Sequence, residues 1–125
     1  GQNLVCEICG TKCKLVGPLW IDNLFDSGFV GAMLNELKNN ENHSSSTNDY
    51  HRLIRMMQTC DKELAYPYYY ETDTIAAVAK KSSISLDIVL STLSDNGFKV
   101  SKTIMNPKGF RTNASQKEIV YLLYK

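Results

Sequence analysis

No apolar run in the sequence approaches the roughly 20 residues that a membrane-spanning helix requires, so we expect no membrane partner. No basic segment followed by an apolar one precedes the first elements, so no secretory leader is visible. Charge of one sign is not in excess, because the 125 residues carry a formal net charge of +1. Such a chain has no overall field that would attract nucleic acid. Wholesale disorder is excluded too, because 43% of the residues are hydrophobic and 22% are charged, as in ordinary globular domains.

The chain also lacks the motifs of common catalytic sites. It contains no G-x-G-x-x-G motif and no phosphate-binding loop. His43 and His51 have no evident Cys or Ser partner, and Asp61 and Glu63 lie two residues apart on an expected helix, where they face different directions. We therefore interpret these four residues as ordinary surface positions and expect the chain by itself not to be catalytic.

Four cysteines, at positions 6, 9, 13 and 60, are not spaced as a disulfide framework, which favours a reducing, intracellular compartment. Cys6-Glu7-Ile8-Cys9-Gly10 is a C-x2-C-G knuckle, in which a tight turn lets two thiolates face one metal ion. The spacing of Cys13, Cys60, His43 and His51 does not require any of them to complete the set. We interpret Cys6 and Cys9 as half of a zinc site in a longer parent protein, and expect zinc to be absent or incompletely coordinated in this chain.

The first half of the chain is expected to hold an extended segment, two helices and a polar loop. Residues 1–22 are interpreted as the cysteine knuckle and an extended segment, because Pro18 forbids a central helix there. A first helix begins at Asp26, whose side chain can accept from the free amides of the first turn, and a second runs from about Asp49 to Leu64. Between them, residues 39–49 are polar and low in complexity, which predicts a flexible insertion.

The second half predicts short elements, from which we expect an α+β fold. In chain order these are a strand within Tyr66–Tyr70, a third helix capped by Thr72 or Asp73, a fourth helix capped by Ser85 and ended by Asn96-Gly97, strands at 98–103 and 110–113 joined by the turn Asn106-Pro107-Lys108-Gly109, and a last helix opened by the capping box of Ser115 and Glu118. From residue 50 the order helix, strand, helix, helix, strand, turn, strand is that of a winged helix-turn-helix. Residues 23–125 are therefore predicted to form a winged-helix-like domain with an extra helix.

Positive charge is concentrated near the C-terminus. Residues 98–125 carry a net charge of +5 and residues 1–97 carry −4. Such a basic segment is a cue for an anionic partner, although a solvated lysine-rich hairpin explains it equally well. The fourth helix presents Asp87 and Asp95 and no side chain suited to reading base edges, which argues against major-groove recognition of DNA. The hairpin instead suits backbone or shape recognition of a folded nucleic acid.

Several short motifs occur together in the order found in one enzyme family. They are Cys6-x-x-Cys9-Gly10, Gly17-Pro18-Leu19-Trp20, Leu24-Phe25-Asp26, Phe29-Val30, Pro67-Tyr68-Tyr69-Tyr70, Asn96-Gly97-Phe98-Lys99-Val100-Ser101, Asn106-Pro107 and Arg111-Thr112-Asn113-Ala114. This combination resembles the C-terminal domain of the tRNA (guanine-26-N2)-dimethyltransferases. The chain departs from that family in lacking a second, upstream C-x2-C pair, and in carrying Ile104, Arg111 and Asn113 near positions where the family has His, Lys and Asp.

The resemblance implies a parent enzyme that uses S-adenosylmethionine to methylate the exocyclic amine of guanine 26 in tRNA. It places the methyl-donor site in an N-terminal domain outside this chain, which agrees with a chain that starts at Gly1 without Met, as a processed or recombinant fragment does. The partners would be tRNA and that catalytic domain, and the location intracellular, nuclear or mitochondrial in a eukaryote.

Within this reading the chain is a tRNA-binding accessory domain. We expect its hairpin cations to contact phosphates and two polar residues to shape the turn: Lys99, Lys102, Lys108 and Arg111 for the first role, Asn106 and Thr112 for the second. Two alternatives stay open, namely a DNA-binding winged helix and a protein-interaction module. In the second alternative, the tyrosine strand or the region of Trp20 and Phe25 would dock onto a partner.

Overall fold

The computed structural model describes residues 4–7, 9–40 and 47–125, and it is an α+β fold with helices at both ends of a small sheet. In chain order the elements are α1 (Ser27–Asn39), α2 (Thr47–Lys62), β1 (Tyr70–Glu71), α3 (Thr72–Ala79), α4 (Leu86–Asp95), β2 (Val100–Lys102), β3 (Gly109–Thr112) and α5 (Gln116–Leu123). The strands form one antiparallel sheet in the order β1-β3-β2. The predicted sequence of elements after residue 50 is therefore confirmed, while most of the predicted insertion, residues 41–46, lies outside the described residues.

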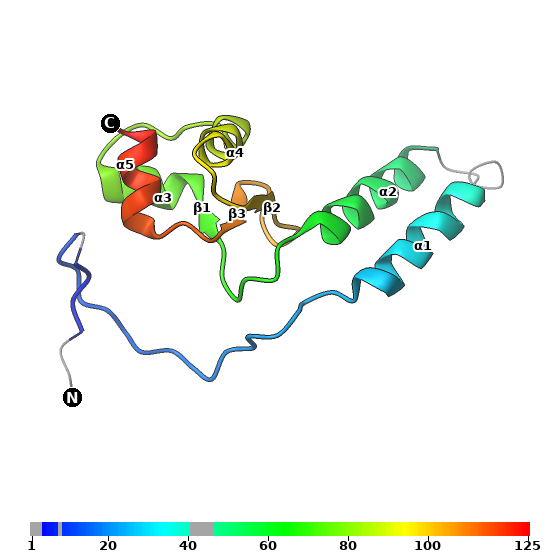
Figure 1. Cartoon of the computed structure of the whole chain (residues 1–125), viewed down its shortest axis with the longest axis horizontal. Coiled ribbons are helices and arrows are strands. Elements are labelled where there is room, and N and C mark those ends of the chain that lie inside the picture. Colours follow the sequence, from blue (N-terminus) through cyan, green and yellow to red (C-terminus); the bar gives the residue numbers. More distant parts are fainter. Residues whose placement is uncertain (1–3, 8, 41–46) are drawn as a thin grey trace.

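Of the two cores formed by the described residues, the larger lies between the sheet and the last three helices (Figure 1). Strand β3 is the central strand, and its register places Phe110 opposite both Tyr70 of β1 and Lys102 of β2. One face of β3 is buried by apolar side chains of α3, α4 and α5, and the fully buried members of this core are Ile75, Val89, Leu93, Phe110, Ala114 and Ile119. The third helix of this unit is α5, which packs against the short helices α3 and α4.

The helix α2 does not join that core but forms a helical hairpin with α1 (Figure 1). Val30 and Leu34 of α1 pack against Met57 and Cys60 of α2 in a second, smaller core. The predicted apolar stripe of α1 is only partly buried, because Phe29 is 66% exposed. In the predicted winged helix, the helix before β1 belongs to the core of the sheet unit. Here that helix, α2, packs on α1 outside this core.

Local signals in the sequence set most helix ends. Asp26 accepts from Phe29 N at 2.9 Å and begins α1, and Ser115 forms a complete capping box at the start of α5, both as predicted. The cap of α3 is Glu71 rather than Thr72 or Asp73, and Ser85 stands at the cap position of α4 without a side-chain cap bond. The helix α2 begins at Thr47, two residues before the predicted Asp49.

The end of α4 adopts the left-handed geometry expected of Asn96-Gly97. Gly97 has a φ of +83°, Gly97 N donates to Ser94 O at 2.9 Å, and Phe98 N donates to Leu93 O at 3.0 Å. These two bonds are the pair of a Schellman motif, which redirects the chain from α4 into β2.

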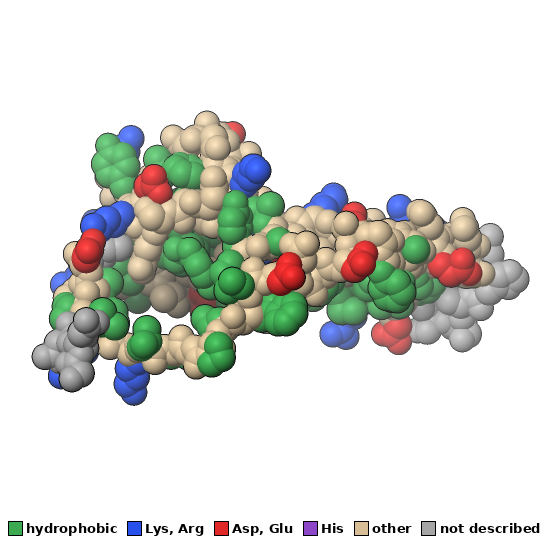
Figure 2. Space-filling model, turned by 60° about the horizontal axis from the view of Figure 1, so that its bottom comes forward, with side chains coloured by type: hydrophobic (Ala, Val, Ile, Leu, Met, Phe, Trp, Pro, Cys, Tyr) green, Lys and Arg blue, Asp and Glu red, His purple; other side chains and the backbone are tan. Residues whose placement is uncertain are grey.

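An extended N-terminal segment leads to α1 (Figure 1). It begins with a small hairpin closed by a bridge between Val5 and Lys12. The residues that follow form no helix before α1, as the presence of Pro18 predicts, and they are largely exposed. Hydrophobic side chains lie at the surface along this segment and along the helical hairpin (Figure 2). Among the described residues, no helix combines the length and the apolar character needed to cross a membrane.

Candidate functional site

The lysines of the predicted phosphate-binding hairpin are exposed but mostly face carboxylates. Lys102 Nζ lies 2.9 Å from Asp87 Oδ1 of α4, and Lys108 Nζ lies 2.6 Å from Asp73 Oδ2 of α3. Hydrogen bonds from Lys108 and Ser83 hold the pKa of the Asp73 carboxyl below its ordinary value. Both pairs are solvent-exposed, so each contributes little stability and can be displaced by a competing anion.

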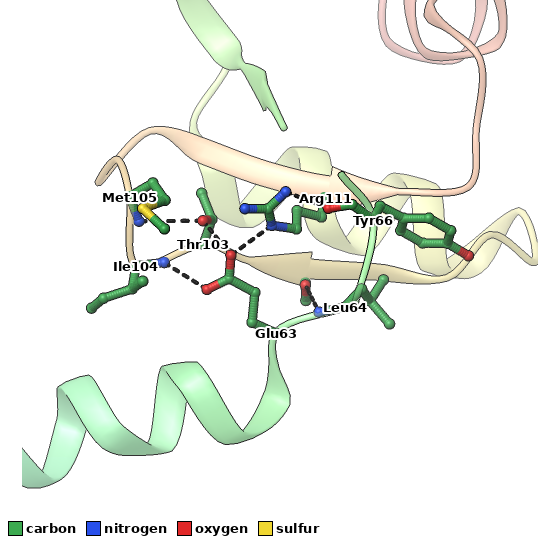
Figure 3. Close-up of polar contacts among 8 residues, drawn as sticks. Glu63, Leu64, Tyr66, Thr103, Ile104, Met105 and Arg111 are labelled. Carbon is green, nitrogen blue, oxygen red and sulfur yellow. Dashed lines mark hydrogen bonds and ion pairs between the residues drawn. The ribbon is translucent and has the colours of Figure 1, made fainter. Parts of the chain in front are cut away.

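Arg111 occupies a different environment from the one expected of a hairpin cation. Its side chain is 3% exposed, and its Nε donates to Glu63 Oε1 at 2.6 Å, while the Glu63 side chain is 1% exposed (Figure 3). The structure therefore leaves no Arg111 surface for a phosphate. The expectation that Glu63 is an ordinary surface residue is wrong, because this carboxylate is the buried counter-ion of Arg111.

Further hydrogen bonds complete a closed polar network around Glu63 (Figure 3). Thr103 Oγ1 donates to Glu63 Oε1, Ile104 N donates to Glu63 Oε2 at 2.9 Å, and the Arg111 guanidinium donates to the Tyr66 carbonyl. The guanidinium also lies 5.7 Å from the centre of the Tyr69 ring. With both carboxylate oxygens and the guanidinium engaged, the network is suited to holding the end of α2 on the β2–β3 hairpin and not to proton transfer.

Three other predicted residues have defined places in the hairpin. Asn106 shapes the turn as expected, since its Oδ1 accepts from Lys108 N at 2.8 Å and its Nδ2 donates to Glu71 Oε1 at 2.9 Å. Thr112 is buried, and its Oγ1 accepts from Ala114 N at 3.1 Å, so it shapes the passage into α5 rather than the turn. Lys99 is exposed and precedes β2, where its backbone N donates to Asn113 Oδ1 at 2.8 Å.

The cysteines at the N-terminus do not form a complete metal site within the described residues. Cys6 and Cys9 lie in the small N-terminal hairpin, where Thr11 Oγ1 is 3.2 Å from Cys9 Sγ and lowers the pKa of that thiol. Cys60 is buried in the core between α1 and α2, so it is not placed to bind a metal ion together with Cys6 and Cys9. His43 lies outside the described residues. No group of three or more metal-ligating side chains occurs in residues 4–7, 9–40 and 47–125, so two thiols alone do not satisfy a tetrahedral zinc ion.

A groove of about 500 Å³ lies between α2 and β2, and Lys102 is the lining residue that the sequence predicted as a phosphate contact. Its lining consists of charged and polar side chains together with one valine: Arg55, Gln58, Thr59, Lys62, Val100, Ser101 and Lys102. Sequence reasoning missed Arg55 and Lys62 because they lie outside the basic segment, and only the folded chain brings α2 beside β2.

Comparison with known proteins gives one consistent family. A family model described as N2,N2-dimethylguanosine tRNA methyltransferase matches residues 2–124. The tRNA (guanine(26)-N(2))-dimethyltransferase of Methanobrevibacter smithii is 31% identical over 116 residues, which is 92% of this chain and 29% of that protein. The protein of the same name from Saccharolobus islandicus is 32% identical over 117 residues, again 92% of this chain and 29% of the relative. The chain therefore spans less than a third of the length of these curated relatives.

A solved structure shares the fold. Trm1 from Pyrococcus horikoshii, in complex with S-adenosyl-L-methionine, matches with a TM-score of 0.72 and 22% identity. The match covers 94% of this chain and 33% of that one. The arrangement of helices and sheet in Figure 1 is thus also found as one part of a larger protein.

Proposed function

Because the chain belongs to the N2,N2-dimethylguanosine tRNA methyltransferase family, we propose that it is the C-terminal, tRNA-binding part of a tRNA (guanine-26-N2)-methyltransferase. The observation that carries this proposal is the match over residues 2–124 to a family whose curated members are more than three times as long. S-adenosylmethionine, in this proposal, binds in the part of the parent enzyme that lies outside this chain. The closed network around Glu63 supports this division, because its carboxylate oxygens are already engaged by three donors, Thr103, Ile104 and Arg111.

We further propose that the unit built on β1, β2 and β3 is a winged-helix variant. Its support is the element order together with the sheet order β1-β3-β2 and the turn between β2 and β3. In this variant α5 takes the place beside α3 and α4, and α2 is released to pair with α1. The polar surface of α4 carries Asp87 and Asp95, so recognition of a nucleic acid would use its backbone rather than its base edges.

The proposal is tested by titrating the chain with folded tRNA and with duplex DNA of equal length at several salt concentrations. We expect tighter binding to tRNA, with an affinity that falls as salt rises because phosphate contacts release counterions. A chain that binds both nucleic acids equally and feebly would contradict the proposed tRNA-binding role.

A second candidate function, docking onto the catalytic part of the parent enzyme, is favoured by the apolar N-terminal segment. Leu15 is 90% exposed, Ile21 77% and Trp20 68%, which is unusual for side chains of this size in one short segment. We propose that this segment, residues 15–24, packs against the remainder of the parent. The two functions are compatible, since a domain that positions tRNA must itself be held near the catalytic site.

A further inference from the structure

We propose that the groove between α2 and β2 binds the phosphodiester backbone of folded RNA, with Arg55, Lys62 and Lys102 as the phosphate contacts. This inference rests on the proposed tRNA-binding function and assigns that function to a particular surface. It also extends the site from the β2–β3 turn, which the sequence favoured, to the surface between β2 and α2, and Lys102 belongs to both.

The first support is the position of the lining residues on their elements. Arg55, Gln58, Thr59 and Lys62 stand at positions i, i+3, i+4 and i+7, so they follow one face of α2 over two turns. The other wall is the whole of β2, from Val100 to Lys102. A backbone lying in this groove would meet cations from both walls.

The second support is charge. Three of the lining side chains are cationic and the described lining residues include no carboxylate. Lys102 is paired with Asp87, but their side chains are 54% and 83% exposed, so a phosphate can compete for the ammonium group. The guanidinium of Arg55 supplies the planar donor set that binds a phosphate in a bidentate manner.

The third support is rigidity. Leu64 N donates to Ser101 Oγ at 2.9 Å, which ties the end of α2 to the middle of β2, and the Glu63–Arg111 pair holds the same end against β3. The end of α2 beside Lys62 is therefore held against β2 before any ligand arrives. A preformed site loses less ordering entropy on binding than one assembled from mobile parts.

The lining also discriminates between ligand classes. Pockets for small organic molecules are lined mainly by hydrophobic and aromatic side chains. Here Val100 is the apolar residue among those that line the groove, and the other lining residues carry polar or cationic groups on their side chains. This chemistry fits an extended polyanion better than an enclosed metabolite.

The test compares the variant R55Q/K62Q with the matched control K14Q/K81Q in tRNA titrations at several salt concentrations. All four positions are exposed, and glutamine preserves helix propensity in α2, so both variants should fold as the parent chain does. We expect R55Q/K62Q to weaken tRNA binding about tenfold and to lower the salt slope by about two, while K14Q/K81Q leaves both unchanged. Equal binding by R55Q/K62Q and the unaltered chain would overturn the groove assignment and leave the proposed function standing.

A measurement on the unaltered chain gives an independent answer. Lysine acetylation followed by mass spectrometry should show Lys62 and Lys102 protected by bound tRNA, with Lys14 and Lys81 modified as before. Reactive Lys62 and Lys102 in the complex would overturn the assignment. The unaltered chain could also bind tRNA and duplex DNA equally well, with R55Q/K62Q weakening the binding of both to the same extent. That result would support a phosphate-binding groove and contradict the proposed function. Failure of the unaltered chain to bind tRNA would overturn both.

Discussion

At the scale of single residues, the pair formed by Glu63 and Arg111 joins two parts of the chain that are 48 residues apart. Both side chains are almost fully buried, and Glu63 also accepts from Thr103 and Ile104 while Arg111 also donates to the Tyr66 carbonyl. In such a site the cost of removing water from the charges is offset only while every partner is present. The pair is therefore intolerant of losing one member.

We predict that E63A lowers the free energy of unfolding by about 3–5 kcal/mol, because it leaves the Arg111 guanidinium buried without a counter-ion. Urea denaturation followed by circular dichroism measures the change. The control is D61N, which alters an exposed carboxylate two residues away and should change the free energy of unfolding by less than about 0.5 kcal/mol. The double variant E63L/R111M should be more stable than E63A, since it removes both charges together. A double variant less stable than E63A would contradict this account of the pair.

At the scale of elements, the β2–β3 turn depends on a close approach at Gly109. A Cβ at this position would lie 2.6 Å from Thr103 Cγ2 and 3.1 Å from Asn106 Cβ. The Thr103 side chain cannot rotate away freely, because its hydroxyl is bonded to Glu63. A change in the turn at Gly109 is therefore passed through Thr103 to the buried pair of Glu63 and Arg111.

We predict that G109A lowers the free energy of unfolding by about 1–3 kcal/mol, the range for overpacking a tight site. The matched control is G31A, where a Cβ would meet nothing within 4 Å on helix α1. Because alanine is the better helix former, G31A should raise the free energy of unfolding by about 0.5–1 kcal/mol. Thermal and urea unfolding compare the two, and a G109A variant as stable as the parent chain would show that Thr103 can move.

The elements that the sequence predicted well are those with local signals. The caps at Asp26 and Ser115 and the stop at Gly97 are each determined by residues within one helical turn. The buried role of Glu63 and the groove between α2 and β2 were not predictable in the same way. Both arise from pairing of segments about 40 residues apart, for which a single sequence carries no periodic or capping signal. The charge pattern of the sequence placed Arg111 among the surface cations, because it carries no signal that Glu63, 48 residues away, is its buried partner.

At the scale of the whole molecule, the described part of the chain has two small cores and an apolar segment that belongs to neither. A surface of this kind adds nothing to the stability of the isolated chain. Its apolar side chains instead favour burial against another surface, as the proposed docking onto the catalytic part requires.

We predict that L19S/W20S leaves the free energy of unfolding within about 0.5 kcal/mol of the parent chain, because the two side chains are 60% and 68% exposed. The same variant should bind the separately supplied catalytic part of the parent enzyme at least tenfold more weakly, as measured by calorimetry. The control I88S/M105S changes two side chains that are each 55% exposed elsewhere and should bind as the parent chain does. Undiminished binding by L19S/W20S would contradict the docking role of this segment.

The attachment of α2 to the sheet also has a mechanical consequence. A helix of 16 residues is about 24 Å long. The two residues that follow its end, Glu63 and Leu64, are hydrogen-bonded to the β2–β3 hairpin. The α1–α2 hairpin is therefore held at the end of α2 that adjoins the β2–β3 hairpin, and its far end can rotate about this attachment. A push of about 2 Å at its tip rotates the helix by about 5° about that attachment, so any body that touches the tip applies a torque to the strand that forms one wall of the groove.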